Sequence, residues 1–328
     1  MTHKAHRILL AVAVTVLIAL CVSAGLTYWL TGPALQCDQP STGPAAPGWS
    51  ARSVVSGNRE RCYFLYAPPQ YDPTQETPVV FSFHGFLSNP NSHSLITGWH
   101  ELADEEGFLV IYPQGAGFPQ RWNAGQSWGA PDVDDVQFFA DMLDDLSARA
   151  AVDLTRVYVN GFSNGGGMTV RIGCKAAGQV AAIGSVAGAV VSMGDCAPSR
   201  PVPAIAFHGT SDPLVNYAGG YMGEQIPQSV AELADAPTYF LGAEEWTAAW
   251  AKHNGCNATP ETIPIRGDVR GLRYTGCLQG ASVVLYTIED GGHTWPGGTP
   301  IPFMGKTSRQ LDATKEMWRF FRAHSLDD

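Results

Sequence analysis

A ten-residue stretch, 157–166, constrains the fold of this chain more than any other part of it. It reads V-Y-V-N-G-F-S-N-G-G, so that a short β-branched and aromatic run leads straight into a glycine-rich turn. The run is typical of a buried strand, and the following residues, 168–177, can form a helix. A strand, a sharp G-x-S-x-G turn and a helix form a nucleophile elbow, in which Ser163 projects from a strained turn. The pattern therefore predicts an α/β fold with a reactive serine at a strand end.

A serine hydroxyl is a poor nucleophile by itself and needs a base, which in turn needs an orienting acid. In hydrolases with this elbow, the acid and then the histidine follow the serine along the chain. An apolar run at 204–207 leads to Asp212, and a second run at 283–288 leads to His293. We therefore predict a triad of Ser163, Asp212 and His293, each just past the end of a strand, where open α/β sheets place their sites.

Plainer interpretations of these residues remain open at this point. A chain with 36 glycines contains G-x-S-x-G patterns by chance, Asp212 before Pro213 could open a turn, and His293 could be an ordinary loop histidine. His208 is a rival for the base, but it precedes Asp212 and would break the expected order. We predict that His208 is structural and packs or hydrogen-bonds behind the acid loop.

Two backbone N–H groups are expected to hold the negative charge that develops in acyl transfer. One belongs to Asn164, the residue after the nucleophile, and the other comes from the loop after an early strand. The run 81–83 is followed by a His-Gly-Phe sequence, so we nominate the N–H of Phe86 as the second donor. Gly85 lets the backbone approach closely there.

Three motifs together resemble those of a known esterase family. They read G-F-S-N-G-G at 161–166, H-G-T-S-D-P-L-V at 208–215 and G-G-H-T-W-P-G-G at 291–298. Residues 50–328 are similar to secreted esterases related to poly(3-hydroxybutyrate) depolymerases, which include feruloyl and acetylxylan-type esterases and LpqC-like lipoproteins. The resemblance implies an α/β-hydrolase fold, with Ser163 as nucleophile, Asp212 as acid and His293 as base. It also implies substrates that are hydroxybutyrate oligomers or polysaccharide-linked feruloyl or acetyl esters, with no metal and no cofactor.

Trp122 and Trp295 are candidates for lining the substrate cleft, where they could stack on a sugar or an aromatic acid; packing in the core or a loop is an equal alternative. Two other functions stay open. A serine peptidase of the same fold would use the same triad. A non-catalytic wall- or sugar-binding protein would be favoured if a member of the triad were missing, and none is.

Composition and charge fit a globular enzyme with one large core. The chain has 328 residues, of which 45% are hydrophobic and 15% charged. Its net charge is −10 without a basic cluster, which argues against nucleic acid or an anionic membrane surface as a partner. The expected partner is an ester substrate, possibly polymeric.

Residues 1–31 are predicted to be a signal peptide or a signal-anchor. Residues 8–30 carry no formal charge, and basic residues before them keep that end cytoplasmic. Cleavage after Ala24 would release a secreted enzyme, whereas an intact run is long enough to span and anchor in a bilayer. Either way we expect the catalytic domain, 50–328, to lie outside the cytoplasm behind a tether over 32–49.

Six cysteines follow the apolar segment, an even number that is typical of disulfide-bonded extracytoplasmic proteins. Nearness in sequence favours the pairs Cys37–Cys62, Cys174–Cys196 and Cys256–Cys277. Their spacing lacks C-x-x-C, so zinc binding or thiol redox chemistry is not predicted. Buried free thiols are the alternative.

Alternating strands and helices predict a mainly parallel sheet covered on both faces. The expected strands are 62–67, 79–83, 109–112, 157–159, 181–186, 204–207 and 283–288, and the expected helices are 133–150, 168–177 and 308–324. The acidic start of the first helix, Asp132, Asp134 and Asp135, suits the positive end of a helix, with a calcium site as the less favoured alternative.

Overall fold

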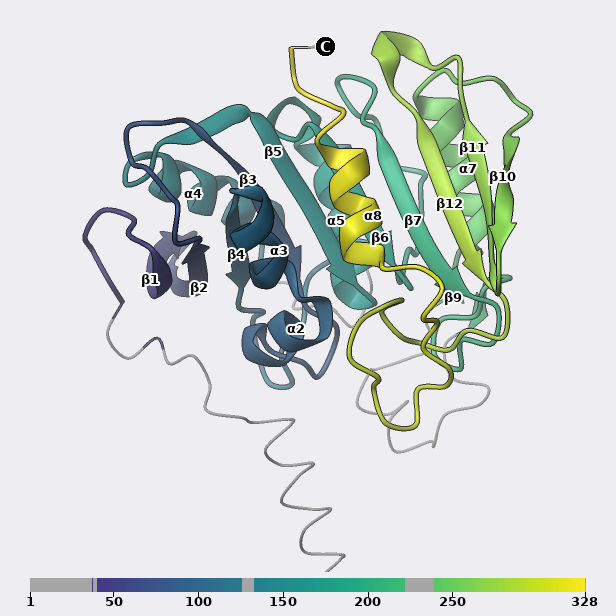
Figure 1. The fold of residues 1–328 in the computed structure, drawn as a ribbon, viewed down its shortest axis with the longest axis horizontal. Helices are drawn as coiled ribbons and strands as arrows, with labels where there is room; N and C mark the ends of the chain where they lie inside the picture. Colours follow the sequence, from purple (N-terminus) through teal and green to yellow (C-terminus); the bar gives the residue numbers. More distant parts are fainter. Residues whose placement is uncertain (1–36, 38–39, 126–132, 222–238, 328) are drawn as a thin grey trace, which may run out of the picture.

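The computed structural model describes residues 37, 40–125, 133–221 and 239–327, and a ten-stranded sheet lies at its centre (Figure 1). The strand order is β1-β2-β4-β3-β5-β6-β7-β12-β11-β10. The strands are β1 Gly48–Ser56, β2 Arg59–Ala67, β3 Thr77–Phe83, β4 Leu109–Pro113, β5 Val152–Phe162, β6 Ala182–Val186, β7 Ala204–Gly209, β10 Glu261–Arg266, β11 Val269–Tyr274 and β12 Val283–Ile288. The six from β4 to β12 in this order are parallel, and antiparallel strands complete both edges. The short strands β8 Gly220–Tyr221 and β9 Tyr239–Phe240 form a separate ribbon.

Helices cover both faces of the sheet, as the alternating pattern predicted. The helices are α2 Pro90–Thr97, α3 Trp99–Glu106, α4 Asp135–Ser147, α5 Asn164–Lys175, α7 Ala243–His253 and α8 Ala313–Phe321. Figure 1 views the sheet from the face covered by α3 and α8, where Trp99, Trp318 and Phe321 are buried. On the opposite face α4, α5 and α7 pack their own apolar stripe, which includes Phe139 and Trp250. The predicted architecture is confirmed.

Capping residues set where two of the helices begin. Helix α4 begins at Asp135 because the Asp134 side chain accepts hydrogen bonds from the N–H groups of the first turn, both at 3.0 Å. In the same way Asp312 accepts from the Lys315 N–H at 3.1 Å, so α8 begins at Ala313 and not at Ser308. Asp134 and Asp312 lie inside the expected helices 133–150 and 308–324, but they act as caps, so both helices begin later than expected.

Several elements were not predicted: strands β1, β8, β9, β10 and β11 and helices α2, α3 and α7. Strand β10 reads E-T-I-P-I-R and lies at the sheet edge, so it lacks the apolar run of a central strand. Helix α7 buries Trp246 and Trp250, but alanines and charged residues surround them in its sequence. These elements take their place from tertiary packing more than from local pattern.

The three predicted disulfides are present: Cys37–Cys62, Cys174–Cys196 and Cys256–Cys277. The first joins the N-terminal segment to β2. The second joins the end of α5 to the loop after β6, and the third joins the end of α7 to the loop before β12. Each closes a loop that contains at least one strand of the sheet.

The predicted signal or anchor segment, 1–31, lies outside the described residues. In the region expected to be a tether, residues 40–47 run against the domain: the Ser41 N–H donates to the Ala51 carbonyl at 2.8 Å, and Arg52 donates to the Gly43 carbonyl at 2.7 Å. Strand β1 begins at Gly48, two residues before the expected boundary. Among the described residues, none of the helices has the length and apolar character needed to cross a membrane.

Candidate active site

Ser163 occupies a strained turn between β5 and α5. Its backbone has φ 57° and ψ −119°, a conformation that a residue with a side chain adopts only when its surroundings hold it there. A Cβ on Gly161 would lie 2.3 Å from the Gly165 carbonyl oxygen, and one on Gly165 would lie 2.2 Å from the Phe83 carbonyl oxygen. Both outer positions of G-x-S-x-G must therefore be glycine, and the serine is left half-buried at the turn.

Backbone hydrogen bonds hold this turn in place. The Ser163 N–H donates to the Val186 carbonyl at 2.9 Å, and the Ser163 carbonyl accepts from the N–H groups of Gly167 and Ala189 at 3.0 and 2.9 Å. The elbow is thus fastened to the end of the neighbouring strand β6 and to the loop that follows it. These bonds offset part of the strain at the serine.

Asp212 and His293 come together at the carboxyl ends of two neighbouring strands, β7 and β12. Asp212 lies three residues beyond β7 and His293 five beyond β12, and these two strands are parallel neighbours with Gly209 beside Ile288. The His293 Nδ1–H donates to Asp212 Oδ2 at 2.7 Å. The His293 ring also packs on the ring of Phe162, with 4.8 Å between centroids, so it lies beside the strand end that carries the serine.

The Asp212 carboxylate is buried and charged. Its Oδ1 accepts the N–H groups of Leu214 and Val215 at 2.8 and 2.9 Å. Burial by itself would raise the pKa of Asp212, but the imidazoles of His293 and His208 outweigh it and hold the pKa well below its usual range. A charged carboxylate can only accept, so Nδ1 of His293 carries the proton and Nε2 has a lone pair for a serine proton.

His208 also lies close to this carboxylate, beside the same oxygen that accepts from His293. Its Nε2–H donates to the Val215 carbonyl at 2.8 Å and lies 3.4 Å from Asp212 Oδ2. The ring is buried within β7. His208 and Val215 stand at the two ends of the loop that carries Asp212, so this hydrogen bond holds the ends of the loop together.

The loop after β3 lies directly against the elbow. A Cβ on Gly85 would lie 3.3 Å from the Ser163 Cβ, a contact tighter than most, so the two backbone segments lie close together. The Asn164 side chain bonds both backbone groups of Trp122: its Oδ1 accepts the N–H at 2.8 Å, and its Nδ2–H donates to the carbonyl at 3.1 Å. The N–H groups of Phe86 and Asn164 stay our prediction for the oxyanion donors.

The two tryptophans predicted for the substrate cleft are instead buried, which corrects that interpretation. Trp122 and Trp295 are both fully buried, so neither offers a ring face to a ligand. The Trp122 Nε1–H donates to the His84 carbonyl at 2.8 Å, and the Trp295 Nε1–H donates to Thr314 Oγ1 at 2.9 Å. Each ring fills space behind a functional loop, and each N–H has a partner, as a buried indole requires.

The acidic residues at the start of α4 are occupied by protein partners. Asp134 caps the helix, and the buried Asp135 carboxylate pairs with Arg61 at 2.8 Å and accepts the Asn123 N–H at 2.6 Å. Asp132 lies outside the described residues. Within the described part of the chain, no group of three or more His, Cys, Asp or Glu side chains is arranged to hold a metal ion.

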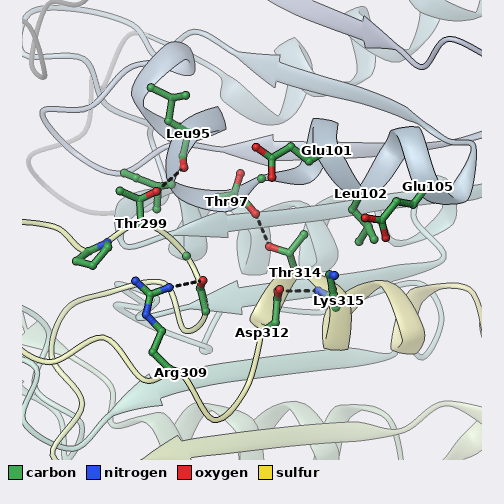
Figure 2. A pocket seen from close by; sticks show the side chains of 15 residues that line it. Leu95, Thr97, Glu101, Leu102, Glu105, Thr299, Arg309, Asp312, Thr314 and Lys315 are labelled. Atoms are coloured by element: carbon green, nitrogen blue, oxygen red, sulfur yellow. Dashed lines mark hydrogen bonds between the residues drawn. The ribbon is translucent and has the colours of Figure 1, made fainter.

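A polar cavity of about 360 Å³ lies apart from these residues, between α2, α3 and the start of α8 (Figure 2). Ser163, Asp212 and His293 do not line it. Glu101, Glu105 and Arg309 face it, and Arg309 donates to the Gly297 carbonyl at 2.9 Å. Residues 297–300, which follow His293 in the chain, form one wall of this cavity. The cavity is lined by none of Ser163, Asp212 and His293, so it is not the place where these three side chains meet.

Comparisons with known proteins agree with this geometry. Residues 61–218 match the family model described as "Esterase PHB depolymerase". The chain is 31% identical over 280 residues to "Putative esterase NocK" of Nocardia uniformis subsp. tsuyamanensis, covering 80% of this chain and 79% of that protein. It is 32% identical over 232 residues to "Feruloyl esterase B" of Piromyces equi, covering 69% of this chain but only 41% of that protein. The chain thus spans under half the length of the Piromyces protein.

The fold has a solved counterpart. The structure of an acetyl xylan esterase from Aspergillus awamori superimposes with a TM-score of 0.58 at 14% identity, covering 83% of this chain and 98% of that one. This likeness confirms the predicted α/β-hydrolase fold.

Proposed function

The chain belongs to the Esterase PHB depolymerase family of carboxylic ester hydrolases, and from that premise we propose that it cleaves esters through Ser163, His293 and Asp212 by way of an acyl-enzyme. One observation carries the proposal. The Asp212–His293 pair, at 2.7 Å, lies at the edge of the sheet where Ser163 stands in a strained elbow. The relatives are esterases, so esters are preferred to the peptides that the same triad could cleave.

In the proposed reaction, Nε2 of His293 takes the hydroxyl proton as Ser163 Oγ attacks the ester carbonyl carbon. The N–H groups of Asn164 and Phe86 stabilise the oxyanion of the tetrahedral intermediate. The intermediate collapses as the bond to the leaving oxygen breaks, and His293 gives its proton to that oxygen, which departs as the alcohol. Asp212 remains ionised and stabilises the imidazolium while it exists. Water, deprotonated by His293, then releases the acid and restores the serine.

We propose esters attached to polymers or oligomers as the substrate class. The support is the family description, which names polyhydroxybutyrate, and the feruloyl esterase among the relatives. Candidate substrates are hydroxybutyrate oligomers and feruloyl or acetyl esters on polysaccharide.

We also propose that the catalytic domain works outside the cytoplasm. The support is its three disulfides, because such bonds persist in oxidising compartments. Whether residues 1–31 are cleaved or anchor the enzyme is decided by sequencing the N-terminus of the exported protein.

Ser163→Ala tests the proposal directly. It should lower kcat on p-nitrophenyl butyrate at least about a thousandfold without unfolding the domain. A fluorophosphonate should label the wild type at Ser163, as located by peptide mapping. Ser192→Ala is the control, because Ser192 is exposed on the loop after β6. This variant should keep the wild-type rate and should still be labelled at Ser163. A label on another residue, or activity left in Ser163→Ala, would overturn the assignment.

The acyl specificity is a separate question. Acetylated xylan, methyl ferulate and hydroxybutyrate oligomers should be compared by kcat/KM, and the preferred ester should exceed the others by at least about tenfold. Equal rates on all three would contradict a dedicated acyl pocket.

A further inference from the structure

His84 is a fully buried histidine, directly after β3, that the proposed reaction does not use. Both of its ring nitrogens are hydrogen-bonded to backbone groups. Nδ1 lies 2.8 Å from the Gly85 carbonyl oxygen, and the Gly115 N–H donates to Nε2 at 3.0 Å. A carbonyl can only accept and an N–H can only donate, so Nδ1 carries the proton and Nε2 the lone pair. The two bonds together require the neutral ring in one tautomer.

The surroundings of His84 keep it in this form. Burial lowers the pKa of His84 to about 4, although its bond to the Gly85 carbonyl works in the opposite direction, and the Arg61 charge adds to the lowering. The ring is therefore neutral near pH 7. It acts as a fixed connector with one donor and one acceptor.

The Nδ1 bond fixes the orientation of one particular peptide. The Gly85 carbonyl, which accepts from His84 Nδ1, also accepts the Ser88 N–H at 3.2 Å. In a trans peptide the C=O and the following N–H point in opposite directions, so clamping this carbonyl turns the Phe86 N–H away from the His84 ring. Gly85 itself lies against Ser163, where its Cβ would be 3.3 Å from that of the serine. The clamped peptide is thus the one that carries the nominated oxyanion donor.

We propose that His84 is a positioning residue for the oxyanion hole, whose Nδ1–H holds the Gly85–Phe86 peptide so that the Phe86 N–H faces the oxyanion at Ser163. The inference rests on the proposed function, because it presupposes attack by Ser163. His84 touches neither the substrate nor the reacting atoms. It acts only through the peptide next to it.

Each ring nitrogen of His84 bonds a different backbone group. Variants that keep only one of these bonds can therefore distinguish a positioning role from a packing role. Nδ1 holds the peptide of the oxyanion donor, whereas Nε2 ties β3 to the loop after β4 at Gly115. An asparagine amide reaches the place of Nδ1, and a glutamine amide reaches that of Nε2. His84→Asn therefore keeps the donor to Gly85, and His84→Gln keeps the acceptor for Gly115. Each variant loses one buried hydrogen bond, so the two should lose similar stability.

The experiment compares kcat, KM and the inhibition constant of an alkylboronic acid, whose adduct on Ser163 resembles the tetrahedral intermediate. His84→Gln should lower kcat about a hundredfold, with KM nearly unchanged and the boronate weakened by a similar factor. His84→Asn should keep kcat within about tenfold of the wild type, although its melting temperature should fall as much as that of His84→Gln. His93→Leu is the control, since His93 is another buried histidine, which bonds Ser82 at 2.9 Å; it should lose stability and keep kcat.

A second measurement needs no variant. In wild-type enzyme with ¹⁵N-labelled phenylalanine, the amide proton of Phe86 should move downfield when the boronate binds. A Phe86 proton that does not respond, or equal kcat in His84→Asn and His84→Gln, would overturn the inference while leaving the triad intact. Wild-type enzyme that hydrolyses no ester, or activity that survives Ser163→Ala, would overturn the proposed function and the inference with it.

Discussion

Replacing Asp212 by asparagine tests how much of the proposed reactivity depends on one buried charge. The Asp212 side chain has no exposed surface and accepts the Nδ1–H of His293 at 2.7 Å. It stays ionised, because the two neighbouring imidazoles outweigh the effect of burial on its pKa. In the proposed reaction His293 takes the serine proton, and the new positive charge then forms beside this carboxylate. Asparagine has nearly the same shape and removes only the charge and one acceptor.

The size of the effect follows from these contacts. The asparagine oxygen can keep the bonds from the N–H groups of Leu214 and Val215, which places its amide nitrogen against His293. An amide N–H facing Nδ1 favours the tautomer in which Nε2 holds the proton, and a protonated Nε2 cannot accept another from the serine. The same change in a serine protease lowers kcat about 10⁴-fold, and we expect a similar loss here, worth about 5 kcal/mol of transition-state stabilisation.

The assay is the steady-state rate on p-nitrophenyl butyrate at pH 7.5. Circular dichroism measures the folded fraction of each preparation, so that kcat refers to folded enzyme. Asp134→Asn is the matched control, because Asp134 also accepts two backbone N–H groups but lies at the start of α4. It should keep full activity. His208→Gln should lose less than about tenfold, because His208 braces the acid loop and takes no proton from the serine. If Asp212→Asn kept a tenth of the wild-type kcat, the triad as proposed would be wrong.

Two further predictions concern residues beneath the site. Trp122→Phe should lower the free energy of unfolding by about 1 to 3 kcal/mol, because the His84 carbonyl loses a buried donor. KM should stay unchanged. A large rise in KM with unchanged stability would instead mean that Trp122 contacts the substrate. The folded state resists protonation of His84, whose pKa falls from 6.5 to about 4, so the contribution of His84 to the free energy of unfolding should fall by about 3 kcal/mol as the pH drops through that window. Urea denaturation at pH 7, 5.5 and 4 measures this, and His84→Asn should flatten the slope; equal midpoints at all three pH values in the wild type would contradict it.

The central strands and the elbow could be predicted because their signals are local. A β-branched run followed by G-F-S-N-G is a short-range pattern, and the steric reason lies in the turn itself, where Gly165 meets the Phe83 carbonyl. The order of serine, acid and histidine could be read along the chain. Parallel strands then bring the three strand ends to one edge, so Asp212 and His293 meet although 80 residues separate them.

The supporting residues could not be predicted in the same way. His84, in a His-Gly pair, has a sequence context no different from an ordinary strand-ending turn, and its tautomer depends on Gly115, which lies 31 positions away. The tryptophans were ambiguous because an indole serves equally well in a core and in a cleft. Burial depends on which loops close over the ring, and this is a tertiary property.

The two nominated oxyanion donors stand on different elements, and this explains why a buried tryptophan belongs between them. Phe86 follows β3, whereas Asn164 begins α5, so an independent shift of either element would separate the donors. Trp122 bonds both sides: its N–H and carbonyl hold the Asn164 side chain, and its indole N–H holds the His84 carbonyl. A misplacement of about 1 Å can cost a hundredfold in rate, so such a fixed link has catalytic value even though it touches no substrate. We therefore expect the distance between the two nominated donors to depend on these buried contacts.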